Sequence, residues 1–344
     1  MKALRCLAIL AVIMGMVVSC TQAPAAAPTA TQAPAASPTP QLPLFYGAYA
    51  TPIEEPWDGV IHVALKAAAD AGKIRYEYQD NIGYSGDMER VLRDIADTKK
   101  PAVIFGDAFG NEEAVRRVAA DYPNIAFVFG SGGGPADPNL SVFDNWIHEP
   151  AYLCGMLAGG LTKTNIIGVV GGYPVPEVNR LLNAFIQGAK EINPAVKVKI
   201  TFINSWFDLA ASKEAALALM GTGADVLFAE RDGVIQAAAG QKLFAFGNMS
   251  DQNSLAPDIV VTGPVWNMTP TVDYVINEVA AKTFTAQDLK DFSMMAKGGA
   301  SLAPFHGLDA KIPADLLKKV QDREAQIKSG LFRVDISEIT PAGD

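Results

Sequence analysis

Residues 101–130 read PAVIFGDAFGNEEAVRRVAADYPNIAFVFG, and this stretch decides the fold class. Two short apolar runs, AVIFG and IAFVFG, have the length and composition of buried strands. Between them, Ala114, Val115, Val118 and Ala119 recur at helical spacing. A strand, a helix and a second strand in this order form a crossover unit whose two strands lie parallel. We therefore expect an α/β protein built on a parallel sheet.

The same alternation extends on both sides of this unit. Before it, LFYGAY and IRYEYQD predict two more strands, and after it a second series begins at NIIGVVGG, residues 165–172. The second series continues with VKVKITFI, ADVLFAE, KLFAFG and DIVVTG, separated by segments with helical apolar spacing. Two successive series of similar size predict two lobes of the same α/β architecture.

The last third of the chain predicts one amphipathic helix, at residues 272–279, and one charged helix, at residues 313–328. We expect this part to cross back between the lobes, so that several crossings form a hinge. The predicted division gives one lobe residues 44–146 with about 266–285. The other lobe takes residues 147–265 with about 286–344.

The first residues, MKALRCLAILAVIMGMVVSC, predict a signal peptide over residues 1–20. Lys2 and Arg5 precede an apolar run that is too short to span a membrane and that ends at Ser19-Cys20. This ending resembles a bacterial lipobox, which predicts that Cys20 becomes a lipid-bearing N-terminus. Residues 21–43 consist of Ala, Pro, Thr, Gln and Ser with almost nothing else, which predicts a semi-stiff tether between the lipid and the folded part.

The composition excludes several classes of function. The chain has 28 Lys and Arg against 37 Asp and Glu, a net charge of −9, so nucleic acid is an unfavourable partner. Its three cysteines and three histidines show no metal-ligand spacing, and we expect neither a metal nor a cofactor. Neither GxSxG nor a Walker A motif is present. The glycine-rich residues 130–134 lack the Lys-Ser/Thr of a phosphate loop and predict a loop on the lobe surface.

Ligands of open parallel sheets bind beyond the carboxyl ends of the strands, so the residues that follow each strand are the candidates. All four tryptophans of the chain fall at such ends, together with carboxylates and amides. Aromatic faces beside polar edges suit a planar heterocycle, although sugars also stack on aromatic rings. The predicted ligand contacts are Trp57, Asp107, Phe109, Asn145, Trp206, Phe207, Asp232, Asp251 and Trp266.

Three stretches carry a resemblance to a known family: EPAYLCG at residues 149–155 with Thr162-Lys163, GVVGGYPVPEV at residues 168–178, and Asn193-Pro194 with NSWFD at residues 204–208. In these stretches the chain resembles the basic membrane protein (BMP) family of substrate-binding lipoproteins of ABC transporters. The resemblance covers roughly residues 44–332. It implies the type I periplasmic-binding-protein fold, with two Rossmann-like lobes, a hinge, and a purine base or nucleoside held in the cleft.

The resemblance also implies roles for individual residues. Trp57 matches the aromatic residue that stacks on the base, and Asp107 and Phe109 match a second contact segment. Trp206 and Phe207 match the aromatic contribution of the second lobe. Asp232 and Asp251 match polar positions that face the base or the ribose. One departure is that TPIEEPW, residues 51–57, replaces the family's Asp-x-x-Phe-Asn, which favours an adenine-like base over a nucleoside.

The expected protein is therefore not an enzyme. It is a monomeric, extracytoplasmic receptor, lipid-anchored to the cell membrane, that delivers a small molecule to an ABC permease. Two alternatives stay open: an enzyme that hydrolyses nucleosides with cleft carboxylates, and a sugar-binding or sensor lipoprotein of the same fold.

Overall fold

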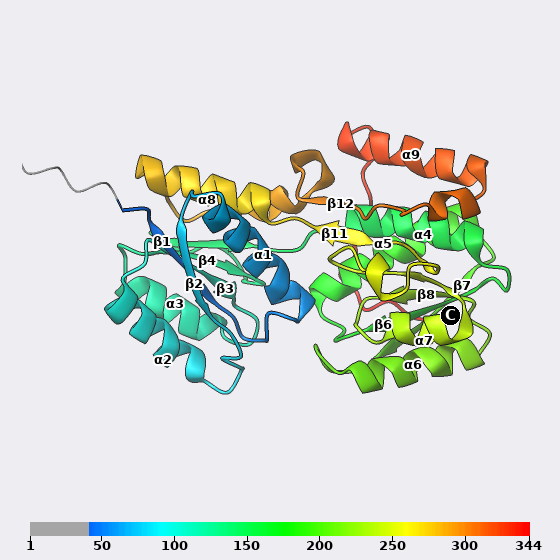
Figure 1. Ribbon diagram of the computed structural model, residues 1–344, viewed down its shortest axis with the longest axis horizontal. Coiled ribbons are helices and arrows are strands. Elements are labelled where there is room, and N and C mark those ends of the chain that lie inside the picture. Colours follow the sequence, from blue (N-terminus) through cyan, green and yellow to red (C-terminus); the bar gives the residue numbers. More distant parts are fainter. Residues whose placement is uncertain (1–40) are drawn as a thin grey trace, which may run out of the picture. The chain divides into compact units, whose positions relative to one another are not determined.

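A computed structural model describes residues 41–344 (Figure 1). The predicted leader with Cys20, and residues 21–40 of the predicted tether, lie outside the described residues. No helix in the described part of the chain is long and apolar enough to cross a membrane. The fold class predicted from the sequence is confirmed, because the folded part consists of two α/β lobes, each built on a five-stranded parallel sheet.

The first lobe has the strand order β2-β1-β3-β4-β5. Its apolar residues form two layers, one on each face of the sheet, because successive strand residues point to opposite sides. Helices α1 and α8 cover one face, and α2 and α3 cover the other (Figure 1). The elements are β1 Leu44–Ala48, α1 Pro56–Asp70, β2 Arg75–Gln79, α2 Asp87–Asp94, a π-helical turn Ile95–Lys99, β3 Val103–Asp107, α3 Glu112–Asp121, β4 Ala126–Gly130, β5 Leu140–Phe143 and, much later in the chain, α8 Thr269–Ala281.

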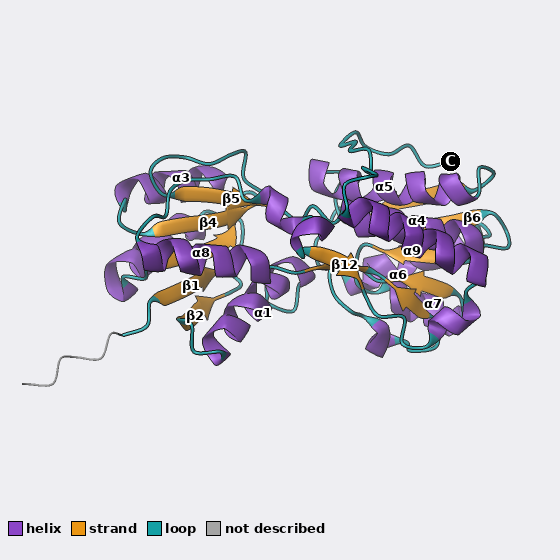
Figure 2. Cartoon of the chain, turned by 90° about the horizontal axis from the view of Figure 1, so that it is seen from above, coloured by secondary structure: helices purple, strands orange, loops and turns teal. Residues whose placement is uncertain are grey.

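The second lobe has the strand order β10-β9-β8-β6-β7. Helices α4 and α5 cover one face, with α9 packed on α4, and α6 and α7 cover the other (Figures 1 and 2). The elements are α4 His148–Leu161, β6 Ile166–Gly171, α5 Pro176–Ile192, β7 Lys197–Phe202, α6 Leu209–Gly221, β8 Val226–Ala229, α7 Val234–Gln241, β9 Phe244–Phe246, β10 Val260–Thr262 and α9 Ala314–Lys328.

The chain passes between the lobes three times. Residues 144–147 lead from β5 into α4, strand β11 (Pro264–Trp266) leads towards α8, and β12 (Ala300–Leu302) returns towards α9. Strands β11 and β12 pair with each other in antiparallel register. Because two of the three crossings are hydrogen-bonded together, the link is a defined hinge, as predicted for this fold.

Helices α4 and α5 pack closely against each other, backbone to backbone. A Cβ atom on Gly155 would lie 2.0 Å from the carbonyl oxygen of Phe185, and one on Gly188 would lie 1.9 Å from that of Tyr152. Neither distance is possible for a side-chain carbon, so only glycine permits the two backbones to approach this closely. The small-residue pattern of residues 149–161 thus fixes the position of α5, whose first turn reaches the pocket described next.

Candidate functional site

A pocket lies where the carboxyl ends of the first lobe's strands meet loops of the second lobe. It encloses about 360 Å³ of empty space, part of which is open to solvent. The cavity inside it that a molecule could fill is only about 30 Å³ in this arrangement of the lobes, well below the volume of small-molecule sites, so a ligand would enter with the lobes further apart. The lining residues are Thr51, Glu55, Trp57, Tyr84, Asp107, Phe109 and Ser131 from the first lobe, and Glu177, Trp206 and Arg231 from the second.

The loop before α1 holds three of these residues in place. The Thr51 hydroxyl and backbone N–H donate hydrogen bonds to Oδ2 of Asp58, at 2.6 and 3.0 Å. Glu55 is the N-cap of α1, because its Oε2 accepts hydrogen bonds from the backbone N–H groups of Trp57 and Asp58. Pro56 follows at the first helical position, where its missing N–H costs nothing. TPIEEPWD therefore folds into a capped turn that aims Trp57 at the pocket.

Aromatic rings form two walls of the pocket. On one side, Trp57 stacks on Phe143 with ring centroids 5.7 Å apart, and Trp266 packs against it at 5.1 Å. On the other side, Trp206 lies 4.8 Å from Tyr173. Each indole is thus held in place by another ring, and the Arg231 guanidinium also lies over the Trp206 ring, 5.3 Å from its centroid.

Phe109 connects the walls. It meets Trp206 of the other lobe edge to face at 5.3 Å, and it meets Tyr84 edge to face at 5.9 Å. Tyr84, Phe109 and Ser131 also line a shallow depression on the outside of the first lobe. These three residues therefore form a rim between the pocket and solvent.

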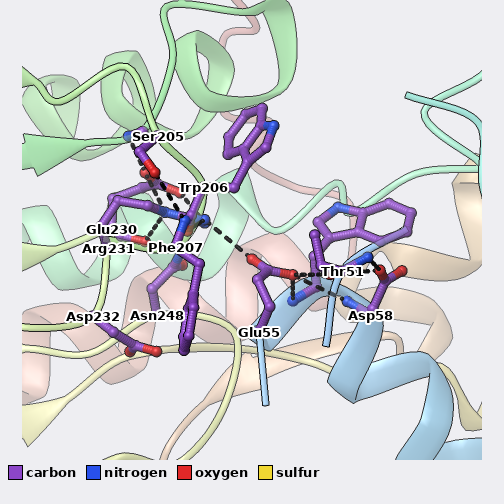
Figure 3. A network of polar contacts seen from close by, with 12 residues as sticks. Thr51, Glu55, Asp58, Ser205, Trp206, Phe207, Glu230, Arg231, Asp232 and Asn248 are labelled. Atoms are coloured by element: carbon purple, nitrogen blue, oxygen red, sulfur yellow. Dashed lines mark hydrogen bonds and ion pairs between the residues drawn. The ribbon is translucent and has the colours of Figure 1, made fainter. Parts of the chain in front are cut away.

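An ion pair joins the lobes across the pocket (Figure 3). Arg231 Nη1 lies 3.1 Å from Oε1 of Glu55, and Nη2 lies 2.7 Å from Oε1 of Glu230. The Arg231 side chain is only 3% exposed, and Nη1 also donates to the carbonyl oxygen of Trp206. A second link is the hydrogen bond from Nε1 of Trp57 to Oε1 of Glu177, at 3.0 Å. Arg231 is the only cation among the described residues that line the pocket, and it is already neutralised, so an anionic ligand would find no free counter-charge among these residues.

Burial shifts the protonation of the pocket carboxyls. It raises the pKa of Asp107 to about 7, although hydrogen bonds from the Phe109 backbone and the Ser131 side chain oppose the shift. Burial also raises the pKa of Glu55, and raises that of Glu177 well above its usual value. Within residues 41–344, no group of three or more His, Cys, Asp or Glu side chains is placed to hold a metal ion.

The structure brings together four of the nine predicted contact residues, Trp57, Asp107, Phe109 and Trp206, in this pocket. Four others lie along a separate groove beside it: Phe207, Asp232, Asp251 and Trp266. Trp266 reaches the pocket only through the ring of Trp57. Asn145 is buried in the first crossing segment and lines neither space. The fourth tryptophan, Trp146, lies apart from the other three, against His148 and Arg180.

Six lining residues are absent from the predicted contacts: Thr51, Glu55, Tyr84, Ser131, Glu177 and Arg231. Thr51, Glu55 and Arg231 do follow strands, so the strand-end rule could have included them. Tyr84 lies five residues beyond β2, in a turn that no strand-end rule reaches. Residues 131–134 form a loop, as predicted, and its first residue, Ser131, also lines the pocket.

Comparison with known proteins agrees with this architecture. A family model described as PnrA-like ABC transporter substrate-binding protein matches residues 53–296. A purine-binding protein of Brucella abortus is 32% identical over 260 residues, which cover 75% of this chain and 72% of the relative. A Haloferax volcanii protein, provisionally named an ABC transporter glucose-binding protein, is 34% identical over 198 residues, 57% of this chain and 50% of that one.

Among solved structures, an ABC transporter solute-binding protein of Aeropyrum pernix superposes with a TM-score of 0.73 at 17% identity, covering 85% of this chain and 93% of the other. At that identity the superposition supports the fold alone. The extent of the family match and the Brucella relative together settle the family. The chain belongs to the PnrA-like (BMP) family of substrate-binding proteins of ABC transporters.

Proposed function

We propose that this substrate-binding protein captures a free purine base, with an adenine-like base favoured, and delivers it to an ABC permease. The observation that carries the proposal is the convergence of Trp57 and Trp206, from opposite lobes, on one pocket whose remaining wall is rich in carboxyls. Stacking on indole faces selects a flat aromatic ring, and carboxyl oxygens accept the ring's N–H and amino groups.

Asp107 supports a purine edge in particular. With a pKa of about 7, the carboxyl exists in both forms at neutral pH. A protonated carboxyl donates one hydrogen bond and accepts another. This pattern is complementary to a ring nitrogen beside an amino group, as on adenine.

The loop before α1 favours a base over a nucleoside, because TPIEEPW at residues 51–57 replaces the family's Asp-x-x-Phe-Asn. The links from Arg231 to Glu55 and from Trp57 to Glu177 join the two lobes at the pocket. A larger ligand would more readily displace one of them, which would leave a buried charge or donor without its partner.

A sugar is the second candidate, favoured by the provisional name of the Haloferax relative. A sugar ring also stacks on tryptophan and its hydroxyls can donate to carboxylates, but the purine-binding Brucella relative matches more of this chain, 75% against 57%. We therefore rank it below a purine.

We further propose the molecular context predicted from the sequence. In it, a lipid on Cys20 and a tether over residues 21–43 hold a monomeric receptor outside the cytoplasm. The proposed lobes are residues 44–146 with about 266–285, and 147–265 with about 286–344. The absence of an enzymatic role is part of the same proposal. Intact-mass measurement of the protein extracted from membranes tests the lipid on Cys20.

The ligand is tested by calorimetric titration with adenine, adenosine and glucose, after denaturing and refolding the protein to remove any copurified molecule. Saturable binding of adenine, tighter than that of adenosine, supports the proposal. Binding of glucose alone would overturn it. Incubation with adenosine, followed by chromatography, tests the hydrolase alternative, for which released adenine is the positive result.

A further inference from the structure

The pocket gathers more acids than cations. Glu55 and Asp107 from the first lobe and Glu177 from the second line it, whereas Arg231 is the one cation among its described lining residues. Glu230 lies next to Arg231 and shares the guanidinium with Glu55 (Figure 3). We propose that the pocket takes up its base together with one proton from the solvent, which the Asp107 carboxyl carries in the complex. The inference rests on the proposed purine ligand.

The ion pairs of Arg231 balance only part of this acidity. Its guanidinium lies 3.1 Å from Glu55 and 2.7 Å from Glu230, so one positive charge serves two carboxyls. All three side chains are at most 4% exposed, and solvent therefore screens them little. No positive charge of this group is left over for a further carboxylate.

The second guanidinium near the pocket is also engaged. Arg180 lies about one turn after Glu177 on α5, and its side chain is 3% exposed. It forms ion pairs with Asp144, at 2.8 Å, and with Glu338, at 2.7 Å. Like Arg231, it already serves two carboxyls, so it does not balance Asp107.

Asp107 itself is held by neutral donors. Its Oδ1 accepts a hydrogen bond from the backbone N–H of Phe109, at 2.9 Å, and the Ser131 hydroxyl is a second donor. Tyr84, from the turn after β2, faces it as a neutral phenol, because burial raises the pKa of Tyr84. Asp107 is 7% exposed. A buried carboxyl with neutral donors and no cation favours its protonated form.

The neighbouring acids strengthen this preference. Glu55 faces Asp107 from the loop before α1, Asp58 from the first turn of α1, Asp144 from the first crossing segment and Glu177 from α5. The charges of Glu55 and Asp144 raise the pKa of Asp107. The charge of Asp107 in turn raises the pKa values of Asp58 and Glu177. One proton on Asp107 therefore relieves repulsion throughout this group of acids.

Closure of the lobes is the step that takes up the proton. The second lobe contributes Glu177, Trp206 and Arg231 to the walls, so these residues cover Asp107 only when the lobes lie together. With the lobes apart, solvent reaches the carboxyl and its pKa returns towards the ordinary value of about 3.9. In the closed arrangement the pKa is about 7. The step is a proton transfer alone, in which open protein, base and one proton give the closed complex.

This linkage makes the affinity for the base depend on pH. Because the pKa of Asp107 is raised in the closed state, the gain in affinity is complete below about pH 4 and is lost as the pH rises through 7. We expect adenine to bind at least about tenfold more tightly at pH 5.5 than at pH 7.5.

The test measures proton uptake by calorimetric titration of the full-length protein with adenine, in buffers of different ionisation enthalpy. The slope of the observed enthalpy against the buffer's ionisation enthalpy gives the number of protons taken up. At pH 6 we expect about one proton per adenine. Asp107→Asn, whatever its affinity, should take up no proton and bind equally at pH 5.5 and pH 7.5. Asp309→Asn, at an exposed position, is the matched control and should behave as the wild type does.

Two results would overturn the inference while the proposed ligand stands. One is adenine binding by the wild type without proton uptake. The other is uptake that persists in Asp107→Asn and disappears in Glu177→Gln, because the proton would then belong to Glu177. If Asp107→Asn does not fold, Ser131→Ala takes its place. It removes a donor that favours the carboxylate, so the midpoint of the pH dependence should move to higher pH, and an unchanged midpoint counts against Asp107.

Absence of adenine binding at every pH would be a failure of the proposed ligand. Small-angle X-ray scattering of the ligand-free protein then decides whether closure takes up a proton. A smaller radius of gyration at pH 5.5 than at pH 8 in the wild type, with no such difference in Asp107→Asn, supports the inference. Equal radii at the two pH values in the wild type overturn it.

Discussion

The guanidinium of Arg231 lies 3.1 Å from the carboxylate of Glu55, although 176 residues and the division between two lobes separate them. Both side chains are almost fully buried, and Glu230 shares the guanidinium. The pair therefore neutralises the pocket's cation and connects the lobes in the arrangement described here.

Replacing Arg231 should destabilise the protein strongly. In Arg231→Met, Glu55 and Glu230 are left buried without their cationic partner, which costs about 3–5 kcal/mol of unfolding free energy. Urea unfolding measures this loss. Adding Glu55→Gln should restore part of it, since one of the two orphaned charges is removed. Lys66→Met, which breaks the exposed Lys66–Asp70 pair, serves as control and should leave the unfolding midpoint nearly unchanged. If the loss of unfolding free energy in the double variant equalled the sum of the losses in Arg231→Met and Glu55→Gln, the coupling of Arg231 to Glu55 would be contradicted.

Truncating Trp206 should weaken adenine binding without unfolding the protein. Trp206 is only partly buried, and its loss removes one stacking face. An aromatic contact contributes about 0.5–1.5 kcal/mol beyond burial, so with burial included we expect at least a tenfold weaker calorimetric affinity for Trp206→Ala. Trp146→Ala is the matched control, because Trp146 is also partly buried and lies outside the pocket. An unchanged affinity in Trp206→Ala would refute the stacking model.

Trp57→Ala should weaken binding too, but it should also destabilise the fold. Trp57 is 7% exposed and packs on Phe143 and Trp266. Its removal leaves a cavity that costs about 3–5 kcal/mol. Thermal unfolding separates this loss of stability from the loss of affinity. A variant with wild-type stability would contradict the described packing of the indole.

Asp107 should make the protein less stable as the pH rises. Its pKa is about 7 in the folded protein and about 3.9 in an unfolded chain. At pH values between these two, the folded protein keeps the Asp107 proton, whereas the unfolded chain has released it. The stabilisation is therefore complete below about pH 4 and is lost as the pH rises through 7. We expect the decline of unfolding free energy from pH 5 to pH 8 to be smaller in Asp107→Asn than in the wild type. Asp309→Asn, at an exposed position, should decline as the wild type does. Parallel curves for all three would show that Asp107 titrates normally.

The α4–α5 contact should not tolerate a methyl group. In Gly188→Ala the new carbon would collide with the Tyr152 carbonyl oxygen, and overpacking of this kind costs about 1–3 kcal/mol. A Cβ atom added to Gly240, on α7, would meet no other atom within 4 Å. Gly240→Ala should therefore be neutral or stabilising by up to about 1 kcal/mol. Chemical denaturation of the two variants makes the comparison, and equal midpoints would contradict the close approach.

The lobes could be predicted from sequence because buried parallel strands are apolar over their whole length. LFYGA and VIFGD are buried along their whole length in the structure. Each is followed by a helix whose apolar residues recur at helical spacing. The fold class depends only on this alternation, which needs no knowledge of long-range contacts.

The site was only partly predictable, since the direction of a loop side chain depends on backbone turns that strand-end position does not specify. Trp206 and Phe207 are adjacent and both aromatic, yet one lines the pocket and the other the groove. Asn204, just before them, has a positive φ of 55°, which sets the turn. Trp266 ends a strand as well, but β11 pairs with β12 and buries the indole behind Trp57.

The backbone-to-backbone contact of α4 and α5 gives Glu177 a mechanical role. Because the backbones of these helices pack directly on each other at Gly155 and Gly188, a ligand that shifts Glu177 at the start of α5 would displace α4 with it. Helix α4 is joined directly to the first crossing segment. Helices α4 and α5 would therefore move together as one rigid unit and rotate about the hinge. Stiffness at the two glycines Gly155 and Gly188, rather than flexibility in the pocket, would then set how far the second lobe swings for a given shift of one carboxyl group.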